Sequence, residues 1–214
     1  GHDFWLIDTA GMRKKAKVHE DLEFYSVMRT INAIESSDVC LLMIDAQQGM
    51  EAQDLSILSL VERNRKGVAI LVNKWDLVEK DTKTAKDYEE KIRERIAPFK
   101  DVPILFISVL DKQRIMKAVD LAMLVYTNKT KHIPTRELND FILPIIENQP
   151  PQTVKGKRVK IKYVSQLKTE ALFMFYCNMP QYVTEAYKRF LENKIRETYD
   201  FSGVPIVISL RKKN

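Results

Sequence analysis

The chain has 214 residues, a formal net charge of +6 and 45% hydrophobic residues, as expected for an ordinary soluble globular protein. Its longest apolar runs, such as Val39–Ile44, have only about six residues, too few for a membrane-spanning helix or a signal peptide. Cys40 and Cys177 lack the spacing of metal ligands and predict reduced thiols. We therefore expect a cytoplasmic protein without membrane contact.

The charge is concentrated in the C-terminal part of the chain. Residues 1–134 contain 21 Lys and Arg against 21 Asp and Glu, a net charge of zero. Residues 135–214 contain 14 against 8, which accounts for the whole +6. A basic surface confined to one module favours an anionic partner such as RNA, although a solvated basic face would give the same count.

Four short apolar runs in the first 134 residues are typical of buried β-strands. They occupy residues 4–7, 39–44, 68–72 and 104–107. Helical spacing of apolar residues recurs around residues 24–34, 55–61, 88–96 and 116–126, and Pro98 ends the third of these helices. Strands that alternate with helices predict a mainly parallel sheet, and strands that are apolar throughout predict helices on both of its faces. The expected fold class is α/β.

The pattern changes near residue 134. A helix is predicted from Thr135, as its N-terminal cap, to about Asn148, with a kink at Pro144. Residues 157–164 alternate cations with apolar residues, which predicts a strand with one basic face. A second strand at 172–177, a helix at 183–199 and a last strand at 206–210 follow. The order α-β-β-α-β predicts a small α+β domain at residues 135–214.

The strongest motif follows the third apolar run and reads Asn73-Lys74-Trp75-Asp76. Polar loops at the carboxyl ends of parallel strands are where open α/β sheets bind ligands. A carboxylate at Asp76 can accept hydrogen bonds from N1–H and the exocyclic amine of guanine, and adenine offers no such pair of donors. Asn73 can tie neighbouring loops together and contact the base, and the stem of Lys74 can lie along the base plane. The motif therefore predicts a guanine-binding loop.

A second motif, Asp8-Thr9-Ala10-Gly11, follows the first apolar run. In this context Asp8 would hold Mg²⁺ through a water molecule, and the Gly11 N–H would contact a γ-phosphate, whose loss on hydrolysis is the basis of a switch. Ser108-Val109 follows the fourth run and is a candidate, by position alone, for backbone contacts to the base edge. The chain contains no G-x-x-x-x-G-K-[ST] phosphate loop.

In this order, the motifs resemble the Der (EngA) family of bacterial GTPases over essentially the whole chain. The matching segments are residues 6–15, 38–40, the run from Asp45 through Gly49 to Gln53-Asp54, residues 73–76, and residues 156–158 with 160–163. The resemblance implies two tandem GTPase domains followed by a KH-like domain. This chain would be an incomplete Ras-like P-loop GTPase domain with a mainly parallel sheet at residues 1–134, the second of the tandem pair, followed by the KH-like domain at 135–214.

The resemblance also implies a function. The implied function is that of a GTP-binding protein, a GTPase, which acts in biogenesis of the large ribosomal subunit. The implied ligands are GTP or GDP and Mg²⁺, and the implied partner is the subunit, its precursor or rRNA. In the family a hydrophobic residue follows the D-x-x-G glycine, here Met12, where many GTPases place the glutamine that orients water. Slow intrinsic hydrolysis of GTP is therefore expected. Another group of the protein, a K⁺ ion or the ribosome would have to compensate for the missing glutamine.

Two consequences follow for these 214 residues. Without a phosphate loop nothing cradles the β- and γ-phosphates, so we assign no catalytic residue and expect no hydrolysis by the chain alone. In folds of this kind a further strand lies between those at 4–7 and 39–44. Without it the chain would pair these two strands directly, borrow a strand from another copy, or use residues upstream.

RNA binding is expected from the basic module, although residues 135–214 contain no G-x-x-G loop of the kind with which KH modules clamp RNA. The candidates are Lys157, Arg158, Lys160, Lys162, Lys188, Arg189 and the Arg211-Lys212-Lys213 tail. One alternative function is a non-catalytic RNA- or ribosome-binding protein with a degenerate nucleotide fold. Another is a protein-interaction module that meets an acidic partner. The sequence leaves the oligomeric state open.

Overall fold

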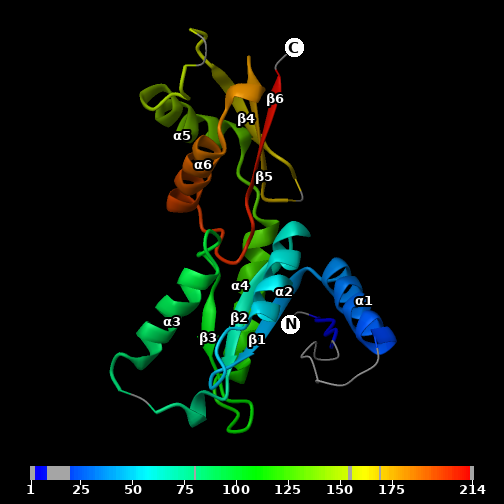
Figure 1. The fold of residues 1–214 in the computed structure, drawn as a ribbon. Helices are drawn as coiled ribbons and strands as arrows, with labels where there is room; N and C mark the ends of the chain where they lie inside the picture. Colours follow the sequence, from blue (N-terminus) through cyan, green and yellow to red (C-terminus); the bar gives the residue numbers. More distant parts are fainter. Residues whose placement is uncertain (1–2, 9–19, 80, 154–155, 169, 213–214) are drawn as a thin grey trace. The chain divides into compact units, whose positions relative to one another are not determined.

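The computed structural model describes residues 3–8, 20–79, 81–153, 156–168 and 170–212, with the backbone alone at 20–27. The chain forms two compact units (Figure 1). Unit 1 comprises Gly1–Tyr126 with Ser202–Val204, and unit 2 comprises Thr127–Phe201 with Pro205–Asn214. The division between them falls inside a helix, α4 (Ile115–Thr130).

Unit 1 contains a three-stranded parallel sheet in the order β1-β2-β3. The strands are β1 (Val39–Asp45), β2 (Gly67–Asn73) and β3 (Ile104–Phe106). The helices of this part of the chain are α1 (Glu20–Ser36), α2 (Ala52–Arg63), the short 3-10 helix η1 (Trp75–Leu77), α3 (Thr84–Arg95) and α4. Three of the four predicted strands and all four predicted helices are confirmed.

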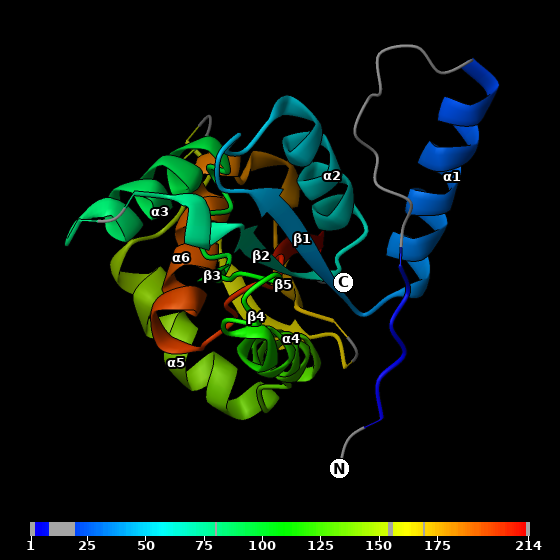
Figure 2. The same ribbon diagram turned by 90° about the horizontal axis from the view of Figure 1, so that it is seen from below.

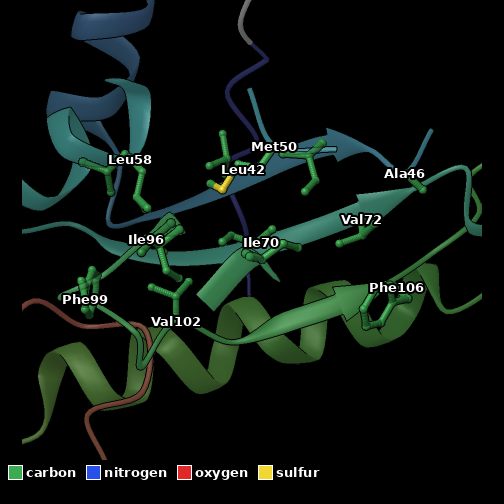
Figure 3. Close-up of a cluster of buried hydrophobic side chains, with 14 of the residues drawn as sticks. Leu42, Ala46, Met50, Leu58, Ile70, Val72, Ile96, Phe99, Val102 and Phe106 are labelled. Atoms are coloured by element: carbon green, nitrogen blue, oxygen red, sulfur yellow. The ribbon is translucent and has the colours of Figure 1, made fainter. Parts of the chain in front are cut away.

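Helices cover both faces of this sheet, with α2 and α3 on one side and α4 on the other (Figure 2). The larger cluster of buried side chains joins alternate residues of β2, such as Ile70 and Val72, to Leu58 of α2 and Ile96 after α3 (Figure 3). On the opposite face Leu71 packs with Ala118 of α4. Because β2 is buried on both faces, its sequence is apolar without alternation.

The predicted strand at Phe4–Ile7 is wrong. Residues 3–8 are described but form no regular structure, and the Trp5 side chain is 96% exposed. In the described sheet β1 is an edge strand that pairs with β2 alone, so the two runs do not pair directly. An extended segment without a hydrogen-bonded neighbour is not stable as a strand, which explains the difference.

Unit 2 has the predicted order α-β-β-α-β. It contains α5 (Thr135–Asn148), β4 (Ile161–Gln166), β5 (Leu172–Cys177), the 3-10 helix η2 (Pro180–Tyr182), α6 (Glu185–Thr198) and β6 (Val207–Lys212). The sheet order is β4-β5-β6, with β5 antiparallel to β4 and parallel to β6. Both helices lie on one side of the sheet (Figure 1) and bury Leu138, Ile142, Leu191 and Ile195.

Local details of unit 2 differ from the prediction. The N-cap residue of α5 is Pro134, and Thr135 is already helical, so the predicted cap is wrong. The cap geometry appears instead at α6, where the Thr184 hydroxyl accepts a hydrogen bond from the Tyr187 N–H at 3.2 Å. The strand predicted from residue 157 begins only at Ile161. The predicted alternation of exposed and buried side chains is also interrupted, because the neighbours Lys162 and Tyr163 are both exposed and Val164 is buried.

The two cysteines are free thiols, as predicted, with Cys177 buried and Cys40 half-buried. Burial raises the pKa of both thiols, so they stay protonated and weakly reactive near neutral pH. Among the described residues, no helix has the length and apolar character needed to cross a bilayer.

The first residue of β2 supplies a stability test. A Cβ at Gly67 would lie 2.6 Å from Cγ1 of Val125, a fully buried and conformationally stiff side chain. We predict that Gly67→Ala lowers the free energy of unfolding of unit 1 by about 1–3 kcal/mol through overpacking. The measurement is urea unfolding followed by the fluorescence of buried Trp75, in a Trp5→Phe background that removes the exposed indole.

The control is the pair of variants Val125→Ala and Gly67→Ala/Val125→Ala. Removing the two methyl groups of Val125 opens room for the new Cβ, so the double variant should lose less stability than the sum of the single changes. Additive losses would show that the contact with Val125 is not the source of the strain.

Candidate functional site

The loop after β2 carries the Asn73–Asp76 motif and has a fixed backbone. Lys74 adopts the left-handed conformation at φ 62°, and η1 begins at the next residue. The Trp75 N–H donates to the carbonyl of Ile107 at 3.1 Å, and the Asn73 carbonyl accepts from the Ala46 N–H at 2.9 Å. The loop is thus tied to the chain segments that follow both neighbouring strands.

Asn73 joins the loops in the predicted manner. Its Oδ1 accepts a hydrogen bond from the Val109 N–H at 3.0 Å, and its Nδ2 donates to Sδ of Met43 at 3.7 Å. The amide therefore connects the end of β2 both to the loop after β3 and to β1. Because both side-chain groups are engaged within the protein, its first role is to position the two loops.

The indole of Trp75 is buried in the core and does not face a ligand site. It packs on Phe106 at 4.2 Å between ring centroids and meets Tyr88 edge-on at 5.4 Å. Trp75 therefore anchors the motif to the hydrophobic cluster of unit 1. Its place among the nucleotide-binding residues remains a prediction, and the structure supports a positioning role.

Asp76 carries the most informative atom in the loop. Its Oδ1 is shielded from solvent and has no hydrogen-bond partner among the described residues. A buried acceptor without a partner costs about 1–3 kcal/mol, so proteins rarely retain one without a function. A ligand that brings an N–H donor to this oxygen would remove that cost.

Asp45 at the end of β1 is a site residue that sequence reasoning missed. Its carboxylate is only 6% exposed and lies 2.7 Å from Nζ of Lys74, and its Oδ1 accepts from the Gln47 N–H at 2.9 Å. Burial and the Asp45 charge raise the pKa of nearby Tyr88. The ion pair fixes the end of the half-exposed Lys74 side chain at Asp45. The signal available in the sequence was a carboxylate at the end of an apolar run. The strand it forms lies beside the strand that ends at Asn73.

Ser108 and Val109 lie next to the motif as predicted, but their N–H groups are engaged within the protein. Ser108 is fully buried and exchanges two backbone hydrogen bonds with Gln113, at 3.2 Å and 2.8 Å. The Val109 N–H is the donor to Asn73. A contact from either residue to a base stays a prediction.

The remaining predicted nucleotide residues are Asp8 to Met12. Asp8 is exposed at the end of the irregular segment 3–8. Thr9, Ala10, Gly11 and Met12 lie outside the described residues. Among the residues that the structure describes, no group of three or more His, Cys, Asp or Glu side chains could hold a metal ion. The role of Asp8 toward Mg²⁺ remains a prediction.

The predicted RNA-binding cations that precede the C-terminal tail separate into two groups. Lys157, Arg158, Lys160 and Lys162 lie in or just before β4 and are exposed. Lys188 and Arg189 lie on α6, where Nζ of Lys188 is 2.7 Å from Glu185. The charge of Lys188 is therefore compensated by Glu185. The four cations near β4 form no ion pair with any described residue.

Comparison with known proteins assigns both parts of the chain. The family described as a 50S ribosome-binding GTPase matches residues 1–74, and the KH-domain-like family of EngA bacterial GTPase enzymes matches residues 132–211. GTPase Der of Flavobacterium psychrophilum is 62% identical and GTPase Der of Flavobacterium johnsoniae 59% identical, each over the whole chain. This chain belongs to the Der (EngA) family.

The chain spans about half the length of these Der relatives, 49% in each case. A crystal structure of an Aquifex aeolicus Era variant bound to GDP and AlF4⁻ is 20% identical and has a TM-score of 0.47. That comparison covers 96% of this chain and 75% of the Era chain. At this level of similarity, nothing about the ligands of Era transfers to the Der chain.

The ion pair of this Der chain gives a direct test of how the guanine motif is held. We predict that Lys74→Ala destabilises unit 1 by about 1–3 kcal/mol, because the buried Asp45 carboxylate loses its cation. Asp45→Asn/Lys74→Ala should recover part of this loss, since no charge is then buried. Urea unfolding followed by Trp75 fluorescence measures both.

Lys86→Ala is the matched control. Its partner Glu90 is exposed and lies 3.8 Å away on the same helix, so its removal should change stability by less than about 0.5 kcal/mol. Equal effects of the two lysine substitutions would mean that burial of Asp45 does not strengthen its ion pair.

Proposed function

We propose that unit 1 supplies the base-binding part of a guanine-nucleotide site in a GTPase that acts in biogenesis of the large ribosomal subunit in the cytoplasm. The observation that carries the proposal is the buried, unpartnered Oδ1 of Asp76 in a loop fixed by Asn73 and Trp75. The names of the Der relatives and the 50S ribosome-binding family support the same class of function.

Base selection follows from hydrogen-bond chemistry. The Asp76 carboxylate offers only acceptors, and guanine presents two donors side by side, N1–H and the exocyclic amine. Adenine has an acceptor at N1, so binding it would leave the buried oxygen without a donor. Sites built around such a polar group reject analogues that lack the matching group by several orders of magnitude.

The phosphate side of the site rests on other residues. We infer that Asp8 contacts Mg²⁺ through water, that Gly11 contacts the γ-phosphate, and that Met12 leaves hydrolysis slow unless K⁺ or the ribosome assists. These 214 residues contain no phosphate-loop motif, so the chain alone should not hydrolyse GTP. Bound Mg²⁺ would neutralise charge on the phosphates.

We also infer that the GTPase domain ends near residue 134 and that the KH-like domain, residues 135–214, binds rRNA. The supporting observations are its net charge of +6 and the exposed cations in and before β4. Contacts to phosphates dominate the affinity of such a surface and make it dependent on salt. The partner would be the large subunit or its precursor.

Guanine selectivity can be tested on this chain despite weak binding. We expect GDP at millimolar concentration to shift the NMR signals of the Asn73 side-chain amide and the Val109 N–H, and ADP to leave them in place. Asp76→Asn should lose the response to GDP and respond instead to xanthosine diphosphate, whose C2 carbonyl matches the amide donor. The readout is base recognition, separate from hydrolysis.

Shifts of equal size with ADP and GDP would refute base selection by Asp76. Unchanged signals with every nucleotide, in a protein whose Asn73 and Trp75 signals are those of a folded loop, would also refute it. A response to GDP that survives in Asp76→Asn would assign the contact to a different residue.

A non-catalytic RNA- or ribosome-binding function is the second candidate, and the basic composition of residues 135–214 favours it. We predict that binding to rRNA weakens steeply with salt, and that Lys160→Ala/Lys162→Ala lowers the slope by about 0.7–0.9 for each lost phosphate contact. The measurement is fluorescence anisotropy between about 50 and 200 mM KCl.

Repeating the titration with saturating GDP and GTP separates the two functions. RNA affinity that responds to the nucleotide supports a GTPase that controls RNA binding. RNA affinity that ignores it, together with failure of the base-selection test, supports the non-catalytic function. A salt slope that the double variant leaves unchanged would remove these lysines from the interface.

A further inference from the structure

The sheet of unit 2 has one covered and one open face. Phe173, Phe175 and Cys177 of β5 are fully buried on the face that the helices cover. The residues between them on β5 are partly exposed, as are their partners on the outer strands. The open face is formed by Tyr163 and Ser165 of β4, Met174 and Tyr176 of β5, and Ser209 and Arg211 of β6.

A bulge in β4 brings an aromatic ring to this open face. Ile161 pairs with Cys177 and Tyr163 pairs with Tyr176, so Lys162 and Tyr163 together oppose one residue of β5. Both are exposed, and Val164 then returns to the core. In a regular strand Tyr163, two residues after Ile161, would share the covered side with Ile161.

Tyr163 and Tyr176 form an aromatic pair across the two strands. Their ring centroids are 5.6 Å apart, the rings are inclined by 46°, and Tyr163 is 41% exposed. Arg211 occupies the position beside Tyr176 on β6, and Lys162 adjoins Tyr163. Two partly exposed rings are thus flanked by cations at both sides of the sheet.

Charges in unit 2 are segregated between helices and strands. The three strands contain Lys162, Arg211 and Lys212 but no acidic residue. Six of the eight acidic residues in 135–214 lie in α5 and α6. Four of these six pair with a cation of the same helix, in Arg136–Asp140, Lys188–Glu185, Lys194–Glu197 and Arg196–Glu192. Among the described residues the strand cations make no ion pair.

We propose that the open face of the β4-β5-β6 sheet binds unpaired bases of single-stranded RNA, with Tyr163 and Tyr176 as the stacking surface and Lys162 and Arg211 as phosphate contacts. The proposal rests on the proposed RNA-binding function and names the form of RNA and the surface. Exposed rings stack on any unpaired base, whereas the bases of a duplex are already stacked on each other. Uncompensated cations beside the rings match the phosphates that accompany those bases.

The test measures binding of the full chain to a fluorescein-labelled ten-nucleotide single strand and to a blunt duplex of ten base pairs. We expect tighter binding of the single strand. Tyr163→Ala and Tyr176→Ala should each weaken it by about 5- to 100-fold, the usual effect of removing one stacking ring. Tyr163→Phe, which keeps the ring, should bind within about twofold of the unaltered protein.

Charge variants give a second readout. Arg211→Ala should lower the dependence of single-strand affinity on salt by about 0.7 in the logarithmic slope. The matched control is Arg136→Ala on α5, which removes the same charge from the same unit but lies on the helix side of the sheet. Far-UV circular dichroism confirms that each variant is folded.

The possible results are distinct. Folded Tyr163→Ala and Tyr176→Ala variants with unchanged affinity, or a duplex bound as tightly as the single strand, would overturn the stacking proposal and leave general RNA binding intact. No binding of any RNA would overturn the proposed RNA function as well. Binding to ribosomal particles that needs Tyr163 while free RNA is not bound would identify a protein partner and overturn the RNA assignment.

Discussion

Parallel hydrogen bonding between β1, β2 and β3 determines where the polar loops of unit 1 lie. With Asp45 beside Asn73 and Phe106 beside Val72, the three strands deliver their following loops to one edge of the sheet. Asp45 reaches Lys74 there, and Asn73 reaches the Val109 N–H, because the register of β1 and β2 is fixed along the full length of β1. A shift by one residue would turn Asn73 to the opposite face and separate Asp45 from Lys74.

Sequence reasoning recovered those parts of the fold that are encoded by periodicity. The runs that became β1, β2 and β3 are apolar because helices cover both faces of the sheet, and the helix positions follow from the spacing of apolar residues. The run at Phe4–Ile7 has the same composition and is not a strand, because composition does not supply a backbone partner. Strand formation depends on a neighbour that no local pattern can reveal.

At the site, motif spacing identified Asn73 and Asp76, and the structure adds the contacts that hold them. The anchoring role of Trp75 and the ion pair between Lys74 and Asp45 depend on residues about 30 positions apart in the chain. In unit 2 the net charge was visible in the sequence. The separation of charges became visible only in the structure, where ion pairs form within the helices and leave the cations of the strands without an acidic partner.

The bulge in β4 also determines where the length of that strand can change. Lys162 is one residue more than β5 requires, and it divides β4 into two parts whose buried sides are out of phase. Loss of Lys162 would restore simple alternation and leave Ile161 and Val164 both on the covered face, whereas loss of a residue elsewhere in β4 would turn the side chains beyond it to the opposite face. A deletion of one residue should therefore be accepted at the bulge and rejected elsewhere in β4. Homologues whose β4 is one residue shorter should lack the bulge and keep the same buried face.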